Sequence, residues 1–139
     1  MIAETQDRKP KDILNALQGM ALTFNPETAG DLEAVIQFEV TGDSAGTYHL
    51  QIEQRKCTFH NGGHENPTMT ILTPAEVWLK IARKEMSGTM ALMMGKYKTK
   101  GNGGLLMKMN SIFSRQITED DLVKMGWMEA NEEKIEVVK

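Results

Sequence analysis

Apolar residues near the start of the chain recur with the two periods that distinguish helices from strands. From residue 13 to residue 24 they are spaced by three and four, which predicts a helix that begins at Pro10 and stops at Asn25-Pro26. In residues 32–40 they alternate with polar residues, and Val35 alone breaks the polarity of the outer face. This alternation predicts a strand with one buried face.

The following residues continue the alternation. A turn at residues 41–46 leads into residues 48–52, which are typical of the answering strand of a hairpin. A third strand is expected to place Cys57 and Phe59 on its inner face, and a fourth covers residues 68–72. We therefore expect four consecutive antiparallel strands.

A helix with a clear start signal follows the fourth strand. Thr73 is a candidate N-cap, Pro74 suits the first helical position, and Glu76 stands three residues after the cap, as in a capping box. Apolar residues at helical spacing extend this helix to about residue 86, with basic residues on the opposite face. Such an amphipathic helix must lie against another part of the protein.

The next stretch changes from an apolar segment to a strand and then to a helix. Residues 89–95 contain a run of consecutive apolar residues, so we expect this segment to be buried or to cover a ligand. Alternating lysines in residues 96–100 predict a fifth strand with one solvated face. Gly101-Asn-Gly-Gly104 predicts a turn into a helix, whose buried stripe comes from residues 105–113.

This order of elements predicts an α+β fold. A single, mainly antiparallel five-stranded sheet would carry helices packed on one face, with an apolar cavity between sheet and helices. The 139 residues suffice for one domain, and no linker or repeat interrupts them before residue 115. We therefore predict one domain over residues 1–139, in which residues 119–139 form a C-terminal lid or tail.

Two features of the apolar residues leave alternatives open. Thr118-Glu-Asp-Asp121 is typical of a helix start, and the Trp127 and Met128 that follow it belong either to the core or to a lid over the cavity mouth. The chain also has 11 methionines, most of them between residues 86 and 128. They either fill an ordinary core or line a cavity that adapts to a flexible apolar guest.

Composition excludes several classes of protein. A net charge of −3 gives the chain no overall basic field of the kind that nucleic acids require. The single cysteine, Cys57, excludes an internal disulfide and favours a reducing compartment. No apolar run has the length of a membrane span or of a signal-peptide core. We expect a cytoplasmic protein with no nucleic-acid partner.

One cluster of residue types suggests metal or thiol chemistry. Cys57, His60 and His64 are ligand types, but Cys57 and His60 have opposite parity on a strand and therefore point to opposite faces. The inner face also offers Cys57 no neighbouring base, which a catalytic thiolate needs. We therefore predict no metal, no cofactor and no catalytic residue.

Two further signals each allow a structural and a functional interpretation. The turn at Gly101-Asn-Gly-Gly104 lacks the Lys-Ser/Thr of a phosphate-binding loop, which favours a structural turn over contact with a phosphate headgroup or coenzyme A. Basic residues greatly outnumber acidic ones between residues 80 and 108. They form either a solvated face or a site of transient contact with an anionic membrane surface.

Two short motifs stand in an order that a known family uses. Ala91-Leu-Met-Met-Gly-Lys96 follows the amphipathic helix, and Lys98-Thr-Lys-Gly-Asn102 ends a strand before an apolar helix. In this order they resemble the Ala-Phe-Met-Ser-Gly-Lys-like and Lys-Gly-Asp motifs of the sterol carrier protein type 2 family, the non-specific lipid-transfer proteins. The resemblance covers most of residues 10–115, with Leu92 in place of the usual Phe and Met94 in place of Ser.

The resemblance implies reversible, non-catalytic binding and transfer of a lipid, namely a fatty acid, fatty acyl-CoA, phospholipid or sterol. Two alternatives stay open: an accessory or scaffold protein in lipid or quinone metabolism, and an enzyme that uses Cys57 for acyl or thioester chemistry. The oligomeric state is not determined. The candidate lipid-binding residues come from inner faces and from the apolar segment that the family shares: Phe38, Tyr48, Trp78, Leu92, Met93, Leu106, Met109, Ile112, Phe113 and Met125.

Overall fold

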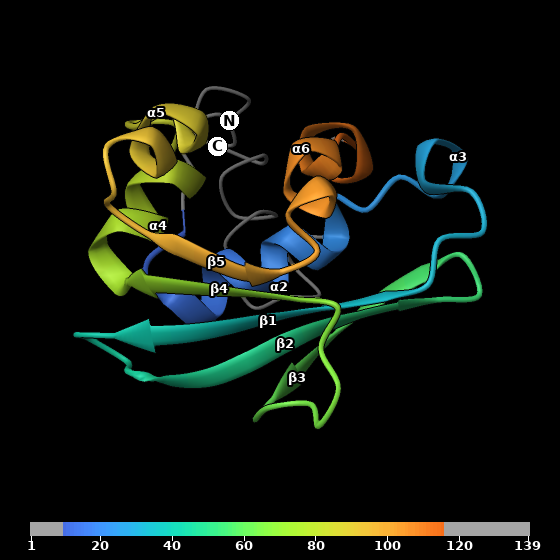
Figure 1. Ribbon diagram of the computed structural model, residues 1–139, viewed down its shortest axis with the longest axis horizontal. Coiled ribbons are helices and arrows are strands. Elements are labelled where there is room, and N and C mark those ends of the chain that lie inside the picture. Colours follow the sequence, from blue (N-terminus) through green and yellow to red (C-terminus); the bar gives the residue numbers. More distant parts are fainter. Residues whose placement is uncertain (1–9, 116–139) are drawn as a thin grey trace, which may run out of the picture.

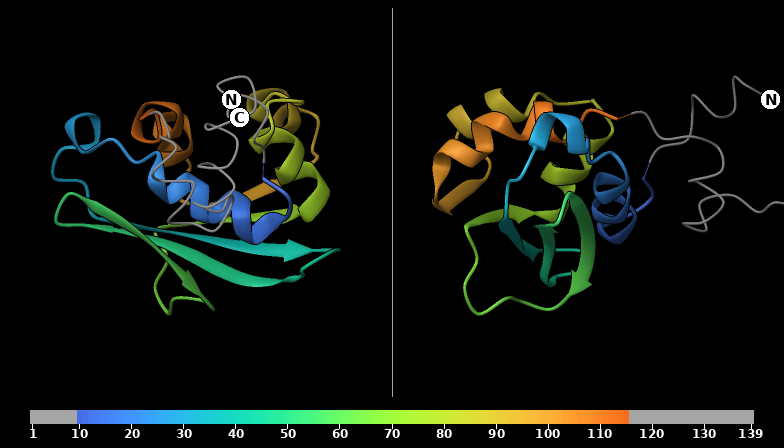
Figure 2. Two further views of the ribbon diagram at one scale, coloured as in Figure 1. Left: turned by 180° about the vertical axis from the view of Figure 1, so that it is seen from behind. Right: turned by 90° about the vertical axis from the view of Figure 1, so that its right-hand side faces the viewer.

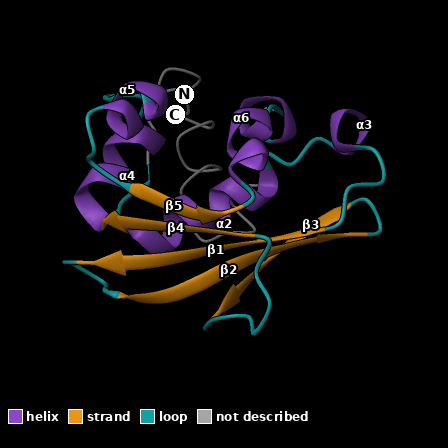
Figure 3. Cartoon of the chain, viewed as in Figure 1, coloured by secondary structure: helices purple, strands orange, loops and turns teal. Residues whose placement is uncertain are grey.

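A five-stranded mixed sheet carries helices on one of its faces (Figures 1 and 3). The computed structural model describes residues 10–115. The strands lie in the order β3-β2-β1-β4-β5. They are β1 (Ala34–Thr41), β2 (Gly46–Glu53), β3 (Lys56–Asn61), β4 (Met69–Pro74) and β5 (Lys98–Gly101). The helices are α2 (Ile13–Leu22), α3 (Pro26–Ala29), α4 (Ala75–Ala82), α5 (Gly88–Met93) and α6 (Gly103–Ile112).

The fourth strand lies elsewhere than the sequence pattern suggested. β4 does not pair with β3 but lies beside β1 and parallel to it, whereas the other neighbouring strands are antiparallel. The expectation of four consecutive antiparallel strands is therefore wrong at this pair. The physical reason is that the β3–β4 connection crosses the outer face of the sheet and brings β4 to the free edge of β1, instead of turning back beside β3. This connection and the helices cover the two faces of β1, which is buried along most of its length.

The connection between β3 and β4 covers part of the outer face of the sheet (Figure 2). The backbone N–H of His64 donates to Gln37 Oε1 at 2.7 Å, and His49 Nδ1 donates to the Gly62 carbonyl at 2.8 Å. Gln37 and His49 are consequently buried on a face that we expected to be solvated. Val35, the apolar outlier on that face, is buried there as well.

Side-chain caps mark most helix starts, but the predicted cap at Thr73 is wrong. Asp12 accepts a hydrogen bond from the Asn15 N–H at 2.9 Å at the start of α2. Asn25, expected to stop that helix, instead caps α3. Thr73 belongs to β4 and is buried. Because its hydroxyl donates to the Pro74 carbonyl and caps no helix N–H, α4 begins without a side-chain cap. α4 also ends at Ala82, short of residue 86.

Alternate strand residues form the lower layer of the core, beneath the helices. Ile36 and Leu50 have no exposed surface, and the strand register places Phe59 opposite Leu50 and Cys57 opposite Ile52. The predicted inner position of Cys57 and Phe59 is therefore confirmed. Burial of these apolar side chains, at about 25 cal/mol per Å², is the main stabilising term for such a layer.

A close backbone approach explains the glycine that ends β5. Gly101 has φ of +91°, and a Cβ atom built on it would lie 2.6 Å from the carbonyl oxygen of Thr68. Both the left-handed φ and the backbone clash disfavour any side chain here.

We expect Gly101→Ala to lower the free energy of unfolding by about 3 kcal/mol, the sum of an unfavourable φ and an overpacked contact. Gly103→Ala is the matched control, because nothing lies within 4 Å of a Cβ at that position and Ala favours the helix that starts there. Urea unfolding of both variants measures the difference. Equal stabilities would show that the approach to Thr68 relaxes without cost.

Candidate functional site

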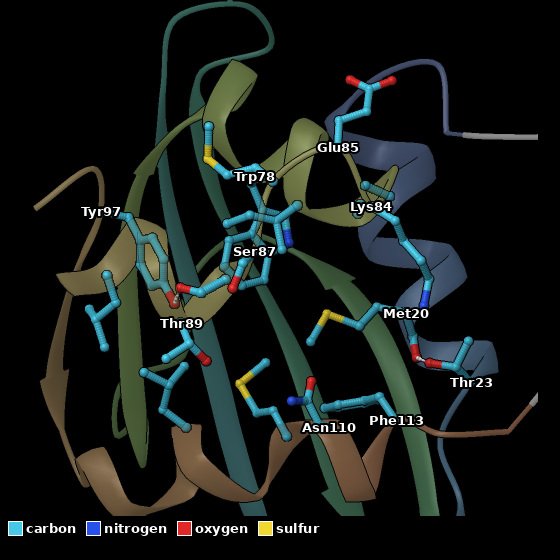
Figure 4. A pocket seen from close by; sticks show the side chains of 18 of the residues that line it. Met20, Thr23, Trp78, Lys84, Glu85, Ser87, Thr89, Tyr97, Asn110 and Phe113 are labelled. Carbon is cyan, nitrogen blue, oxygen red and sulfur yellow. Dashed lines mark hydrogen bonds between the residues drawn. The ribbon is translucent and has the colours of Figure 1, made fainter. Parts of the chain in front are cut away.

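A pocket of about 860 Å³ lies within the helix layer (Figure 4). Its walls come from α2, α4, α5 and α6 together with the segment that joins α4 to α5. The volume lies in the range of small-molecule sites. Most of the lining is apolar: Pro10, Ala16, Met20, Trp78, Ile81, Ala82, Met86, Leu92, Leu106, Met107, Met109 and Phe113.

Trp78 forms the boundary between this pocket and the sheet. Its ring contacts Phe38 of β1 edge-on, with centroids 5.2 Å apart, and Tyr97 with centroids 5.5 Å apart. Edge-to-face aromatic contacts of this kind stabilise by about 1 kcal/mol beyond the buried area. No residue of β1–β5 is among the described residues that line the pocket. The pocket therefore lies on the side of Trp78 that faces away from the sheet.

Hydrogen bonds to backbone carbonyls join the helices that form the walls. Arg83, at the end of α4, donates from Nε to the Pro10 carbonyl at 2.8 Å. On the other side, the Asn25 N–H donates to the Ile112 carbonyl at 2.7 Å and the Arg115 N–H donates to the Thr23 carbonyl at 2.9 Å. α2 is thus tied to α4 at its start and to α6 at its end, with the pocket between them.

The apolar segment that the sequence analysis singled out forms α5, one wall of the pocket. Ser87 caps it by accepting from the Met90 N–H at 3.2 Å, and the Lys96 N–H donates to the Ala91 carbonyl at 2.9 Å beyond its end. Ala91 is buried and Leu92 lines the pocket. The segment is therefore only partly buried, because the side chains on its other side are exposed.

A hydrogen bond from the Tyr97 hydroxyl holds α5 beside the Trp78 ring. Tyr97 is buried against Trp78 and donates from its hydroxyl to the Gly88 carbonyl at 2.9 Å, at the first residue of α5. Burial raises the pKa of the Tyr97 hydroxyl, so this group stays protonated and remains a donor at neutral pH.

Several polar groups also line the pocket. Thr23, Lys84, Ser87 and Asn110 are labelled among them in Figure 4. The Thr23 hydroxyl donates to the Met20 carbonyl at 2.7 Å, so it serves the end of α2. Lys84 adds an ammonium group to the lining, and Figure 4 shows the Glu85 carboxylate pointing away from it. The site thus combines a mostly apolar lining with a few polar groups, which suits an amphipathic molecule.

Half of the predicted lining residues reach this pocket. Trp78, Leu92, Leu106, Met109 and Phe113 line it.

The other predicted lining residues lie elsewhere. Phe38 and Ile112 are buried in the core, and Tyr48 stacks on Phe59 in the lower layer. Met93 is 76% exposed and is not among the residues that line the pocket. Met125 lies outside the described residues. Trp78 lies between Phe38 of the inner sheet face and the space within the helix layer.

Sequence reasoning also missed several lining residues. Met20, Ile81, Met86 and Met107 line the pocket. Helical periodicity marked the first three as apolar wall residues, whereas Met107 lies off the predicted stripe of its helix and was marked only by the abundance of methionines. Helical periodicity predicts which face of a helix is covered, but it does not distinguish packing against a neighbour from facing a cavity. From the methionine-rich stretch, Met86, Met107 and Met109 thus line a cavity.

The metal-type residues lie away from the pocket, on the other side of β3 from Cys57. His49 and His60 stack with ring centroids 4.8 Å apart, and His64 meets His49 edge-on at 5.4 Å. Within residues 10–115, no group of three or more His, Cys, Asp or Glu side chains is placed to hold a metal ion. Cys57 faces the core on the opposite side of the strand, as parity predicted.

No helix among residues 10–115 has the length and apolar character needed to cross a membrane.

Comparison with curated proteins finds relatives that are much longer than this chain. Hydroxysteroid dehydrogenase-like protein 2 of Xenopus laevis is 25% identical over 114 residues, covering 81% of this chain and 27% of the relative. The Rattus norvegicus protein of the same name is 28% identical over 93 residues, covering 66% and 18%. The chain thus spans about a quarter of the length of the Xenopus relative.

Solved structures show the same fold at low sequence identity. Sterol carrier protein 2 like 2 of Aedes aegypti has a TM-score of 0.59 at 21% identity, covering 72% of this chain and 92% of that one. A sec-alkylsulfatase of Pseudomonas sp. has a TM-score of 0.61 at 16% identity, covering 71% of this chain but 16% of that one. UbiJ-SCP2, a ubiquinone synthesis protein, has a TM-score of 0.53 at 16% identity, covering 70% and 86%.

The family comparison covers nearly all of the described chain. The model of the SCP-2 sterol transfer family matches residues 13–114, from the start of α2 to just beyond α6. This span includes every described strand and every pocket helix, so the resemblance seen in the sequence is confirmed. The chain belongs to the SCP-2 sterol transfer family.

Proposed function

We propose that this protein binds a lipid reversibly in the helix-layer pocket and transfers it without catalysing a reaction. The observation that carries the proposal is an apolar pocket of about 860 Å³ in a member of a sterol transfer family. Each buried CH₂ group of a ligand would contribute about 0.8 kcal/mol, so an acyl chain gains substantial affinity from burial alone.

Fatty acids, fatty acyl-CoA, phospholipids and sterols are the ligand classes that we consider. Met20, Met86, Met107 and Met109 support a flexible acyl chain over a rigid shape, because unbranched thioether side chains adapt to their guest. The related fold of sterol carrier protein 2 like 2 from Aedes aegypti has been solved in palmitated form. The ammonium group of Lys84, in the pocket lining, would suit an acidic headgroup.

The proposal of a non-catalytic role rests on the chemistry of the one cysteine. Burial raises the pKa of the Cys57 thiol from 9.0 to about 12, so the nucleophilic thiolate is scarce at neutral pH. Cys57 also lies on the sheet side of the core and is not among the pocket residues.

A cytoplasmic location stays a prediction from the sequence.

An accessory role is the second candidate. It is supported by the lengths of the relatives, since this chain matches only 27% of the Xenopus laevis protein, and by the likeness of its fold to UbiJ-SCP2. In this alternative the domain would act through protein contacts within a larger assembly. Native mass spectrometry separates the two: a bound lipid supports carriage, whereas a lipid-free protein in a stable complex supports the accessory role.

We expect Leu92→Arg to abolish binding of a fluorescent fatty acid, because bound ligand would desolvate the introduced charge. The matched control is Met93→Arg, which places the same charge one residue further along α5 at a position that is 76% exposed. Titration of both folded variants gives the affinities. Unchanged affinity in Leu92→Arg would place the ligand outside this pocket.

Tyr97→Phe is expected to weaken fatty acid binding by two- to tenfold, because α5 loses a hydrogen bond of about 1 kcal/mol that holds it to the pocket floor. Tyr48→Phe is its control, since the Tyr48 hydroxyl also donates to a backbone carbonyl, that of Ser44, but lies outside the pocket. Affinity and unfolding free energy are measured for both. If both variants bind as the wild type does, α5 is held in place without this bond.

A further inference from the structure

Lys84 has a backbone conformation that is unfavourable for a lysine. It stands two residues after the end of α4 with φ of +64°, in the left-handed region. The Lys84 N–H donates to the Ile81 carbonyl at 3.0 Å, and the Glu85 N–H donates to the Lys80 carbonyl at 2.8 Å. These two hydrogen bonds form a Schellman motif, in which the left-handed residue is usually glycine because a Cβ atom is disfavoured there. A lysine at this position therefore lowers the stability of the helix end.

The same lysine lines the pocket. It is the one basic residue among the described residues that do so. Figure 4 shows its side chain extending in the direction of Met20 and Thr23 at the end of α2, while the Glu85 carboxylate points away from it. Because Lys84 is also exposed, its ammonium group is accessible both from solvent and from the pocket.

The charge of Lys84 has no structural partner in the described part of the chain. No carboxylate or carbonyl group of residues 10–115 pairs with its ammonium group. The neighbouring Arg83 differs, because its guanidinium donates to the Pro10 and Lys11 carbonyls and so ties the end of α4 to the segment before α2. Residues held in unfavourable backbone conformations cluster at ligand sites. Lys84 combines such a conformation with an unpaired charge and a place in the pocket lining.

We propose that Lys84 determines the charge of the ligand, so that the pocket selects a free fatty acid over an esterified lipid or a sterol. The ammonium group pairs with the carboxylate, while the acyl chain lies against the apolar lining. One cation matches the single negative charge of a carboxylate better than the several charges of a coenzyme A group. This inference rests on the proposed lipid-binding function and adds the ligand class and the residue that determines it.

Titration with a fluorescent fatty acid and with the methyl ester of the same molecule tests this role, because only the acid carries the charge. We expect the wild-type protein to bind the acid about tenfold more tightly than the ester, as one charge-assisted hydrogen bond provides. Lys84→Gln should bind both probes with the affinity that the wild type has for the ester. Lys84→Arg keeps the charge and should keep the preference.

Lys80→Gln is the matched control for the loss of charge. It removes a lysine from an exposed position of α4 that does not line the pocket, so it should keep the preference for the acid. A preference that is absent from the wild type, or that survives in Lys84→Gln, would overturn the proposal. So would an equal loss in Lys80→Gln, because that result would reflect the overall charge of the protein.

Lys84→Gly distinguishes a ligand-binding role from a structural one. Because glycine adopts the left-handed conformation without steric cost, this variant should melt about 3 °C above the wild type while it loses the preference for the acid. A melting temperature below that of the wild type would assign the Lys84 side chain a structural role and contradict the proposal.

The methyl ester separates this proposal from the one on which it rests. Binding of the ester without any preference for the acid would contradict the role of Lys84 and leave lipid binding in the pocket standing. Failure of the wild type to bind either probe would contradict lipid binding itself, and the role of Lys84 with it.

Discussion

The contact of Trp78 with Phe38 below and Tyr97 beside it is the constraint on which the pocket depends. It joins the central strand of the sheet to α4 and to the segment that holds α5. The indole lies between the apolar side chains of the strands and the pocket, which is enclosed by α2, α4, α5 and α6. A densely packed layer thus supports a hollow one.

The pocket stays open because hydrogen bonds hold its helices in place at their ends, although side chains do not fill the space between them. α5 has 6 residues and α3 has 4, lengths that are not stable as isolated helices in water. Arg83, Asn25 and Tyr97 tie the pocket helices to backbone carbonyls of distant segments. Methionines along the walls provide apolar surface that can rearrange around a guest. Rigid ends and adaptable walls together suit reversible binding.

The sequence predicted those features that depend on local rules. Strand alternation placed Cys57 and Phe59 on the inner face, and the glycine turn before α6 is where Gly101 approaches Thr68. Features that depend on contacts between distant parts of the chain could not be predicted from it. The parallel pairing of β4 follows from a connection over the outer face, for which the buried Val35 was the one local sign. Helical periodicity did not show that Met20 and Met86 face a cavity, because a covered face and a lined cavity have the same pattern.

The central claim, that an acyl chain lies against Trp78 in the helix-layer pocket, is tested most directly by fluorescence quenching. The chain has two tryptophans, so in a Trp127→Phe variant the emission comes from Trp78 alone. A fatty acid brominated along its chain quenches tryptophan only in close contact. We expect saturable quenching that an unlabelled fatty acid reverses. Stoichiometric binding of the brominated fatty acid with unchanged Trp78 emission would contradict the account.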